Sequence, residues 1–288
     1  MNMTKFFFIA VLTLFTSNII SAQVNILNVT KGEDLTKNAN DNELSLENDK
    51  PLDYGYVNKR DILWSKVVWE FIDISQKINL PYFFPIQPIN NRRSLFDNLI
   101  KGIKAGEIKD IYDDSYFTTK LTNEEIEDKL SYVRTSIGAD GKKYYDTITN
   151  ASIDNKGYMI KGMWYFDKRH GELKYRLLAI GPIGKDVKRK QDDSTESIDK
   201  PLFWVFYPSA RQVLHNSKVF NSMNSAQSIS YDHMLNARRF NSVIVREENI
   251  YGNRAIEDYV RGNSLFQLLE ANKIKEDIRN REMDMWNY

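Results

Sequence analysis

The residue types that most often carry out chemistry are scarce in this chain and lie far apart. It has no cysteine and only three histidines, His170, His215 and His233. No two of them stand four residues apart, which is the helical spacing typical of a zinc motif. No G-x-S-x-G segment marks a nucleophilic serine, so the only possible triad is one assembled from distant positions. We interpret the histidines as surface residues and predict no catalytic residue, no metal site and no cofactor.

Asp113 and Asp114 form the most suggestive acidic pair, because paired carboxylates can transfer protons or bind cations. Adjacent side chains point in different directions, however, and residues 111–115 resemble a turn between two helices. We therefore favour a structural role for this pair. The alternative is a periplasmic hydrolase of the glycosidase type, in which two carboxyl groups face each other across a cleft.

The first residues have the pattern of a secretory signal peptide. Lys5 is the only charge before the apolar residues 6–15, and the small residues Ser21 and Ala22 precede Gln23. This pattern predicts export, with cleavage between Ala22 and Gln23. The apolar run is shorter than the roughly 20 residues that a membrane-spanning helix needs.

The charge balance argues against a nucleic-acid partner. Removal of residues 1–22 would take away one of the 40 basic residues and none of the 39 acidic ones, so that the formal net charge of the remainder is zero. Binding to nucleic acid depends largely on basic residues that neutralise phosphates. A balanced chain with interleaved signs provides no such field.

The hydrophobic pattern predicts an α+β fold, in which an antiparallel four-stranded meander is flanked by N-terminal and C-terminal helices. Residues 23–58 are polar and should form a disordered or extended leader before a single domain at 59–288. We expect residues 59–137 to be helical, 143–208 to form the sheet, and 209–288 to be helical again. The expected helices are 61–79, 92–105, one starting at the capping box of Thr122 and Glu125, 209–221, 230–240, 253–262 and 264–284. The expected strands are 143–150, 157–166, 172–181 and 201–207.

Two further details of this pattern bear on binding surfaces. The prolines at 81, 85 and 88 predict an extended aromatic ribbon at residues 82–86. In the last helix, Leu265, Leu268, Leu269, Ile274 and Ile278 are expected to form the buried apolar stripe.

Several aromatic and charged segments together resemble the GldN/PorN family of gliding motility and type IX secretion proteins. The matching segments are Trp64–Asp73, Lys77–Tyr82, Pro85–Ile86, Arg93–Asp97, Tyr112–Asp114, Ala237–Phe240 and Glu282–Trp286. The likeness extends over most of residues 60–288 and is distributed, which makes it more specific than one short motif.

The resemblance implies a non-enzymatic structural subunit of a periplasmic ring complex. Its implied partners are a GldK/PorK-like outer-membrane lipoprotein, the periplasmic part of a GldM/PorM-like protein, and further copies in the ring. The lipoprotein would hold the chain at the inner face of the outer membrane, since the chain lacks a cysteine for lipid attachment. Interfaces concentrate binding energy in aromatic residues. The candidate interface residues are Tyr82, Phe83, Phe84, Trp286 and Tyr288, and intramolecular packing is the alternative for each.

A second alternative function is a carbohydrate-binding module that presents tryptophans on its sheet. Exposure of Trp164 and Trp204 on one face would favour such a module, whereas burial of both would make them core residues.

Overall fold

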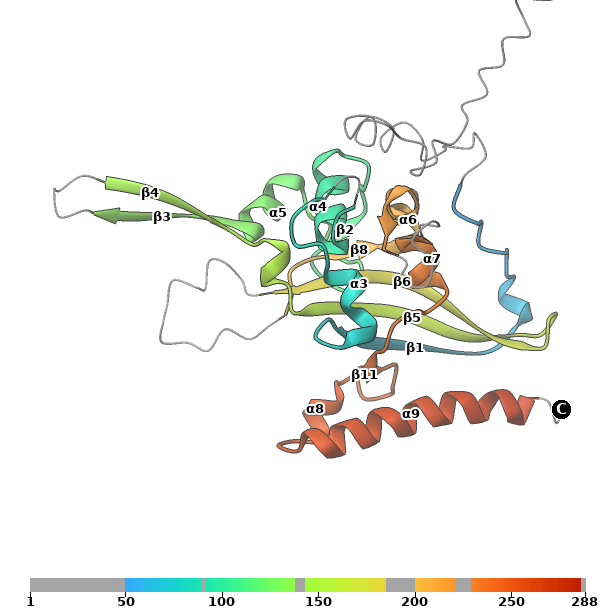
Figure 1. Cartoon of the computed structure of the whole chain (residues 1–288). Coiled ribbons are helices and arrows are strands. Elements are labelled where there is room, and N and C mark those ends of the chain that lie inside the picture. The colour runs from blue at the N-terminus through green and yellow to red at the C-terminus, as the bar shows by residue number, and fades with distance from the viewer. Residues whose placement is uncertain (1–49, 90–91, 138–142, 185–199, 221–228, 286–288) are drawn as a thin grey trace, which may run out of the picture. The chain divides into compact units, whose positions relative to one another are not determined.

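The computed structural model describes residues 50–89, 92–137, 143–184, 200–220 and 229–285, all of which belong to one compact unit at residues 50–288. They form a large antiparallel sheet with helices packed against it (Figure 1). This confirms the predicted α+β class. Of the leader predicted at residues 23–58, the structure describes only the part from residue 50. The predicted signal cleavage site, Ala22 and Gln23, lies outside the described residues.

The main sheet has seven strands. Its strands are β1 (Ile62–Asp73), β2 (Ile111–Tyr112), β5 (Gly157–Asp167), β6 (Glu172–Gly184), β7 (Lys200–Pro201), β8 (Trp204–Phe206) and β11 (Val243–Glu247). The order is β11-β1-β5-β6-β8-β2, with β7 paired to the end of β6. The predicted strands 157–166 and 172–181 are therefore correct, and they form the central antiparallel hairpin.

The predicted helix 61–79 is wrong, because most of this segment is the strand β1. It pairs with β5 along its whole length and with β11 on its other side. Three consecutive residues in the middle of β1, Val68, Trp69 and Glu70, are buried, and such a stretch does not show the polar–apolar alternation of a half-exposed strand. Its apolar residues could therefore be fitted equally well to a helical period, although their β-branched and aromatic types favour a strand.

Glu70, in the middle of β1, is only 2% exposed and is held by an ion pair. Arg238 Nη2 lies 2.7 Å from Glu70 Oε2, and Arg238 Nη1 donates to Glu70 Oε1 at 3.2 Å. The Ser242 hydroxyl donates to the same carboxylate. Because the carboxylate is paired on both oxygens, a charged residue is compatible with this buried position.

The predicted meander is wrong at its first strand. Residues 143–149 form β4 (Lys143–Thr149), which pairs with β3 (Ser131–Ile137) in a separate two-stranded sheet. Residues 131–137 therefore end the helical region earlier than expected. Their β-branched residues and a matching partner strand favour a hairpin over continuation of the preceding helix. A third sheet pairs β9 (Lys218–Val219) with β10 (Ile229–Ser230).

The helices agree with the prediction more closely. They are α3 (Leu80–Phe83), α4 (Leu95–Lys104), α5 (Asn123–Leu130), α6 (Tyr207–Asn216), α7 (Tyr231–Asn236), α8 (Ile256–Tyr259) and α9 (Ser264–Met285), with short 3₁₀ turns at Lys59–Asp61, Lys77–Asn79 and Ser152–Asp154. The capping box of Thr122 and Glu125 begins α5 as expected. The expected aromatic ribbon is wrong at its start, because Leu80–Phe83 is one helical turn with Pro81 at its beginning.

The main core lies between the sheet and helices α3, α4, α6 and α7. Four of its largest buried side chains are tyrosines, namely Tyr82, Tyr158, Tyr207 and Tyr231. Each hydroxyl reaches an acceptor, for example Tyr231 Oη donating to Arg93 O at 2.8 Å and Tyr82 Oη donating to Arg239 O at 3.2 Å. These four aromatic rings therefore fill the core without leaving their own hydroxyls unsatisfied.

A second, smaller core joins helix α9 to the β11 edge of the sheet, where Ala271, Ile274 and Ile278 pack against Val68 and Ile244. A third cluster joins Trp69, Ala179 and Trp204, with Met159 and Phe117 packed beside it. Within the described ranges, no helix is long and apolar enough to cross a membrane.

Candidate protein-binding surface

The first part of the candidate site is the start of helix α9, which leaves large apolar side chains in solvent. The predicted stripe is wrong in its first half: Leu265, Leu268 and Leu269 are 43–61% exposed, and Phe266 is 57% exposed. Only Ile274 and Ile278 from that stripe are buried. A cluster of exposed apolar side chains on one element is typical of an interaction surface.

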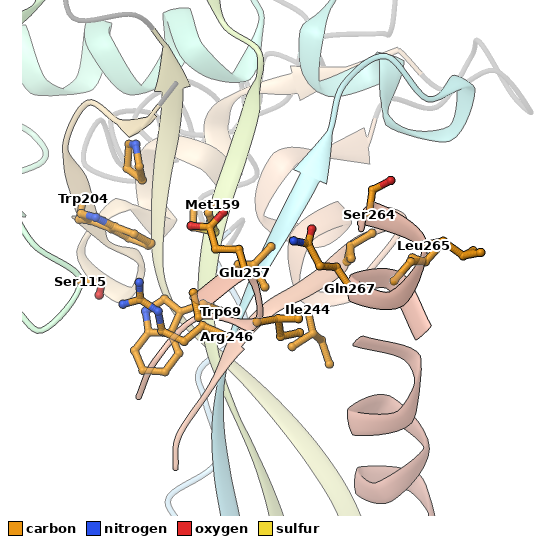
Figure 2. Close-up of a pocket in the computed structure, with 16 residues that line it drawn as sticks. Trp69, Ser115, Met159, Trp204, Ile244, Arg246, Glu257, Ser264, Leu265 and Gln267 are labelled. Carbon is orange, nitrogen blue, oxygen red and sulfur yellow. The ribbon is translucent and has the colours of Figure 1, made fainter. Parts of the chain in front are cut away.

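Leu265 and Leu268 border a groove between the start of α9 and the sheet (Figure 2). The groove has a volume of 840 Å³. Its lining includes Trp69, Ser115, Met159, Trp204, Val243, Val245, Arg246, Ile256, Glu257, Leu265, Gln267 and Leu268. The wall is mainly apolar and aromatic, with a few polar groups, which is the composition expected of a site that binds another polypeptide or an apolar ligand.

Strand pairing explains how residues distant in sequence meet in the groove. Trp69 on β1 is opposite Arg246 on β11 and opposite Lys161 on β5. Lys161 in turn is opposite Ala179 on β6. Directly paired residues point to the same face of a sheet, so this face carries two cationic side chains around one tryptophan.

Lys161 lies in an aromatic cage beside the groove. Its Nζ is 5.1 Å from the ring centroids of Trp69, Tyr116 and Phe117, and it donates to Ser115 O at 2.8 Å. Burial lowers the pKa of Lys161, although the charge of Asp114 opposes the shift. The cation holds the loop that carries Ser115 against the sheet, and this loop forms one end of the groove.

The match to a known protein family covers the whole of this site. The family model described as "Gliding motility associated protein GldN" matches residues 57–287. The chain belongs to the GldN family. As a GldN-family protein it is a component of the gliding motility and type IX secretion machinery, and this is not a known family of enzymes. No curated protein matches the chain significantly.

Of the aromatic residues predicted at the interface, the three that the structure describes, Tyr82, Phe83 and Phe84, do not line this groove. Tyr82 is fully buried and Phe83 packs against the main core, so Tyr82 is a core residue in this structure. Phe84 is 49% exposed, with its ring 4.9 Å from that of Phe83. Trp286 and Tyr288 lie outside the described residues.

The two acids considered for the hydrolase alternative, Asp113 and Asp114, have structural roles. Asp114 accepts hydrogen bonds from the backbone of Tyr116, Thr118 and Thr119, and Asp113 pairs with Lys129. Burial alone would raise the pKa of Asp114, but these hydrogen bonds lower it below its usual value. Among the residues described, no group of three or more histidines and acids is placed to hold a metal ion.

The two tryptophans considered for carbohydrate binding also serve as packing residues. Trp204 is buried against Trp69 in the cluster beneath the groove, whereas Trp164 packs with the core under helix α9. They belong to separate clusters, so they do not form an exposed platform.

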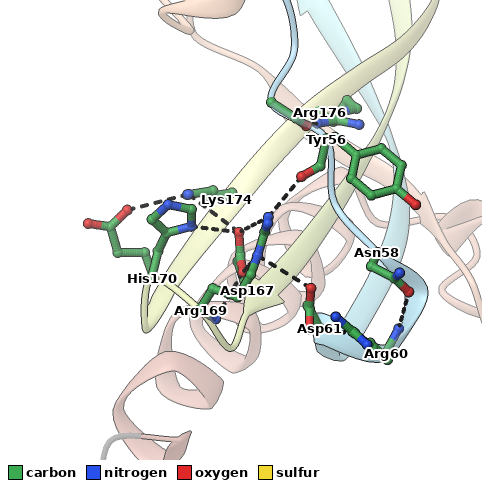
Figure 3. A network of polar contacts seen from close by, with 11 residues as sticks. Tyr56, Asn58, Arg60, Asp61, Asp167, Arg169, His170, Lys174 and Arg176 are labelled. Atoms are coloured by element: carbon green, nitrogen blue, oxygen red, sulfur yellow. Dashed lines mark hydrogen bonds and ion pairs between the residues drawn. The ribbon is translucent and has the colours of Figure 1, made fainter.

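His170 takes part in a polar network around Asp167, at the turn between β5 and β6 (Figure 3). Its Nδ1 lies 2.8 Å from Asp167 Oδ2, and the backbone N–H and side chain of Arg169 donate to Oδ1. The Asp167 side chain is 1% exposed. The hydrogen bond with His170, together with those from Arg169, holds the pKa of Asp167 well below its usual range.

This network predicts a loss of stability in acid that depends on Asp167. Because the folded-state pKa is depressed, the carboxylate stabilises the fold above its unfolded pKa near 3.8. This contribution is lost as the pH falls below that value towards the folded pKa. In urea unfolding at pH 7 and pH 3, Asp167→Asn should therefore lose less stability on acidification than the wild-type chain.

The exposed residue Asp284 provides a matched control, because Asp284→Asn removes a carboxylate at the end of α9 without touching the network. It should show the wild-type difference between the two pH values. Equal acid sensitivity of Asp167→Asn and the wild type would contradict the prediction.

Proposed function

We propose that this chain is a non-enzymatic structural subunit of a periplasmic ring complex in the type IX secretion and gliding machinery. It binds a GldK/PorK-like outer-membrane lipoprotein and, through other surfaces, further copies of itself and a GldM/PorM-like periplasmic domain. The lipoprotein holds it at the inner face of the outer membrane, since the chain has no cysteine of its own to carry a lipid. The observation that carries the proposal is the apolar groove beside the exposed leucines of α9.

The groove supports docking of a polypeptide better than it supports catalysis. The Trp69 and Trp204 rings, Met159 and Leu268 give it a broad apolar wall. Glu257 is the only carboxylate among its lining residues. A chain that works by binding needs buried anchors of this kind, with the central aromatic and aliphatic side chains supplying most of the affinity.

The test is binding of the purified chain to the detergent-solubilised lipoprotein, measured by size-exclusion chromatography with light scattering and by titration. The double variant Leu265→Glu/Leu268→Glu places two charges at the groove. Since burying an unpaired charge is costly, its affinity should fall at least about tenfold, which corresponds to about 1.4 kcal/mol. Both side chains are more than 40% exposed, so the fold should be kept.

Ile250→Glu is the matched control, because Ile250 is 90% exposed and does not line the groove. This variant should bind as the wild type does. Unchanged affinity of the double variant, with both proteins folded by circular dichroism, would rule out the groove as the docking site. Failure of the wild-type chain to bind the lipoprotein would overturn the proposed partner.

A further inference from the structure

Arg246 lines one end of the groove and Lys161 lies beside that end, and among the described residues neither cation has a carboxylate partner. The Arg246 guanidinium lies 5.7 Å from the centre of the Trp69 ring, and Lys161 Nζ lies 5.1 Å from the same ring. In the part of the chain that the structure describes, neither cation is within ion-pair distance of an acid. Figure 2 shows Arg246 next to Trp69 and Ser115 at one end, away from Leu265 at the other.

The acids nearest to this end are already engaged elsewhere. Asp114 accepts hydrogen bonds from its own turn, and Glu248 Oε2 accepts a hydrogen bond from Val67 N at 3.4 Å. Glu257 also lines the groove, but among the described residues it forms no ion pair with Arg246 or Lys161. The charges of Asp114 and Glu248 act on Lys161 from a distance, but among the described residues neither acid forms an ion pair with Lys161 or Arg246.

Among the residues that the structure describes, none provides a hydrogen-bond acceptor for the indole of Trp69, which lies between the two cations. Trp69 is 3% exposed, and its Nε1 is buried without a partner. An orphaned buried donor costs free energy, and native structures rarely leave one without reason. A buried donor and two unpaired cations at one place favour a ligand that brings negative charge and acceptor oxygens.

We propose that the Arg246 end of the groove binds the carboxylate of an aspartate or glutamate side chain in an extended segment of a partner protein. The inference rests on the proposed function of the groove as a docking surface. Arg246 holds the carboxylate through its planar guanidinium, and Lys161 adds charge from beneath. The apolar residues that flank this acid in the partner segment pack on Met159 and Leu268. Because Trp69 orders both cations before binding, little conformational entropy is lost on docking.

The test is selection from a random library of twelve-residue peptides displayed on phage, with the full-length chain as the immobilised target. The peptides are fused at their C-terminus, so any carboxylate that binds belongs to a side chain. Selection on the wild-type chain should enrich peptides with one acid flanked by apolar residues. The same selection on Arg246→Gln should lose the acid and keep the apolar residues.

A synthetic copy of the best peptide then measures the contact directly. Arg246→Gln should weaken its binding on the order of tenfold, and replacing the peptide's acid with its amide should do the same. In the double-mutant cycle the two losses should not add, because each removes the same contact. The affinity of the wild-type pair should also fall with salt.

Arg254→Gln is the matched control. Arg254 lies over the rings of Tyr251 and Tyr259, at 4.6 and 4.8 Å, but does not line the groove. It should leave both the selection and the affinity unchanged. Three results would each overturn the inference. They are selected peptides without acid enrichment on the wild-type chain, an absence of selected peptides, and acid enrichment that survives Arg246→Gln.

The result is separable from that of the proposed function. If the lipoprotein does not bind but acidic peptides are selected and depend on Arg246, the groove recognises a carboxylate on another protein. If the lipoprotein binds through the leucines and the acid has no effect, only the carboxylate contact is wrong.

Discussion

Replacing Asp232 with alanine should lower the free energy of unfolding by about 3–5 kcal/mol, the usual cost of breaking a buried ion pair on one side. Asp232 is 4% exposed and accepts hydrogen bonds from Arg211 Nε at 2.9 Å, Arg211 Nη2 at 3.1 Å and Tyr207 Oη at 2.8 Å. Asn236 Nδ2 also donates to it at 2.9 Å. Its loss leaves a guanidinium that is 9% exposed without a counter-charge. Chemical denaturation followed by circular dichroism gives the difference.

The electrostatics of Arg211 support the size of this effect. Burial opposes its charge, yet the hydrogen bonds and charge of Asp232 outweigh burial and raise the pKa of Arg211. Because the ordinary pKa of arginine is far above neutral pH, the guanidinium stays ionised even when the aspartate is removed. Removing both charges with Arg211→Met/Asp232→Leu should cost less than Asp232→Ala alone. A loss below about 1 kcal/mol in the single variant would show that the pair contributes little.

Replacing Tyr82 with alanine should cost about 3–5 kcal/mol, as expected for removal of a fully buried aromatic side chain. Its ring packs 6.2 Å from Tyr231 and 6.3 Å from Phe240, between centroids, and its hydroxyl donates to Arg239 O. The cavity would lie between α3, α7 and the segment that leads into β11. The thermal midpoint and the urea midpoint should both fall.

Two neighbouring changes separate the contributions at this position. Tyr82→Phe keeps the ring and loses one hydrogen bond, so it should cost about 1 kcal/mol. Phe84→Ala removes a side chain that is 49% exposed and should change stability by roughly 0.5 kcal/mol. Equal losses for Tyr82→Ala and Phe84→Ala would mean that the described burial is wrong. Any test of this segment in assembly should therefore use Phe84, since Tyr82→Ala lowers the stability of the whole fold.

Asp232→Ala and Tyr82→Ala should affect binding at the docking surface only by lowering the overall stability of the chain. Asp232 lies on α7 and Tyr82 on α3, against the main core, whereas the groove is formed by β1, β11, α8 and the start of α9. A destabilised chain that is still folded at the assay temperature should bind the lipoprotein with wild-type affinity. Because stability and lipoprotein binding depend on different residues, a variant that loses its fold in cells can be distinguished from one that loses only the interface.

Local signals determined a good part of this fold from sequence. The Thr122–Glu125 capping box set the start of α5, because it satisfies backbone donors within one turn. The turn at 168–171 joins two apolar runs and specifies the β5–β6 hairpin. Family membership also followed from the sequence, since aromatic and charged residues spread along the chain are compared without reference to contacts.

The tertiary structure alone decided where the apolar residues lie. Residues 62–73 became a central strand because β5 and β11 supply partners on both sides, and a periodicity measured along one segment cannot register those partners. Tyr82 was placed in the core by helices that come much later in the chain. The groove unites Trp69, Met159, Trp204, Arg246 and Leu268, whose meeting depends on strand register and not on spacing. Burial is a property of long-range packing, so only the folded chain shows which leucines of α9 are left for a partner.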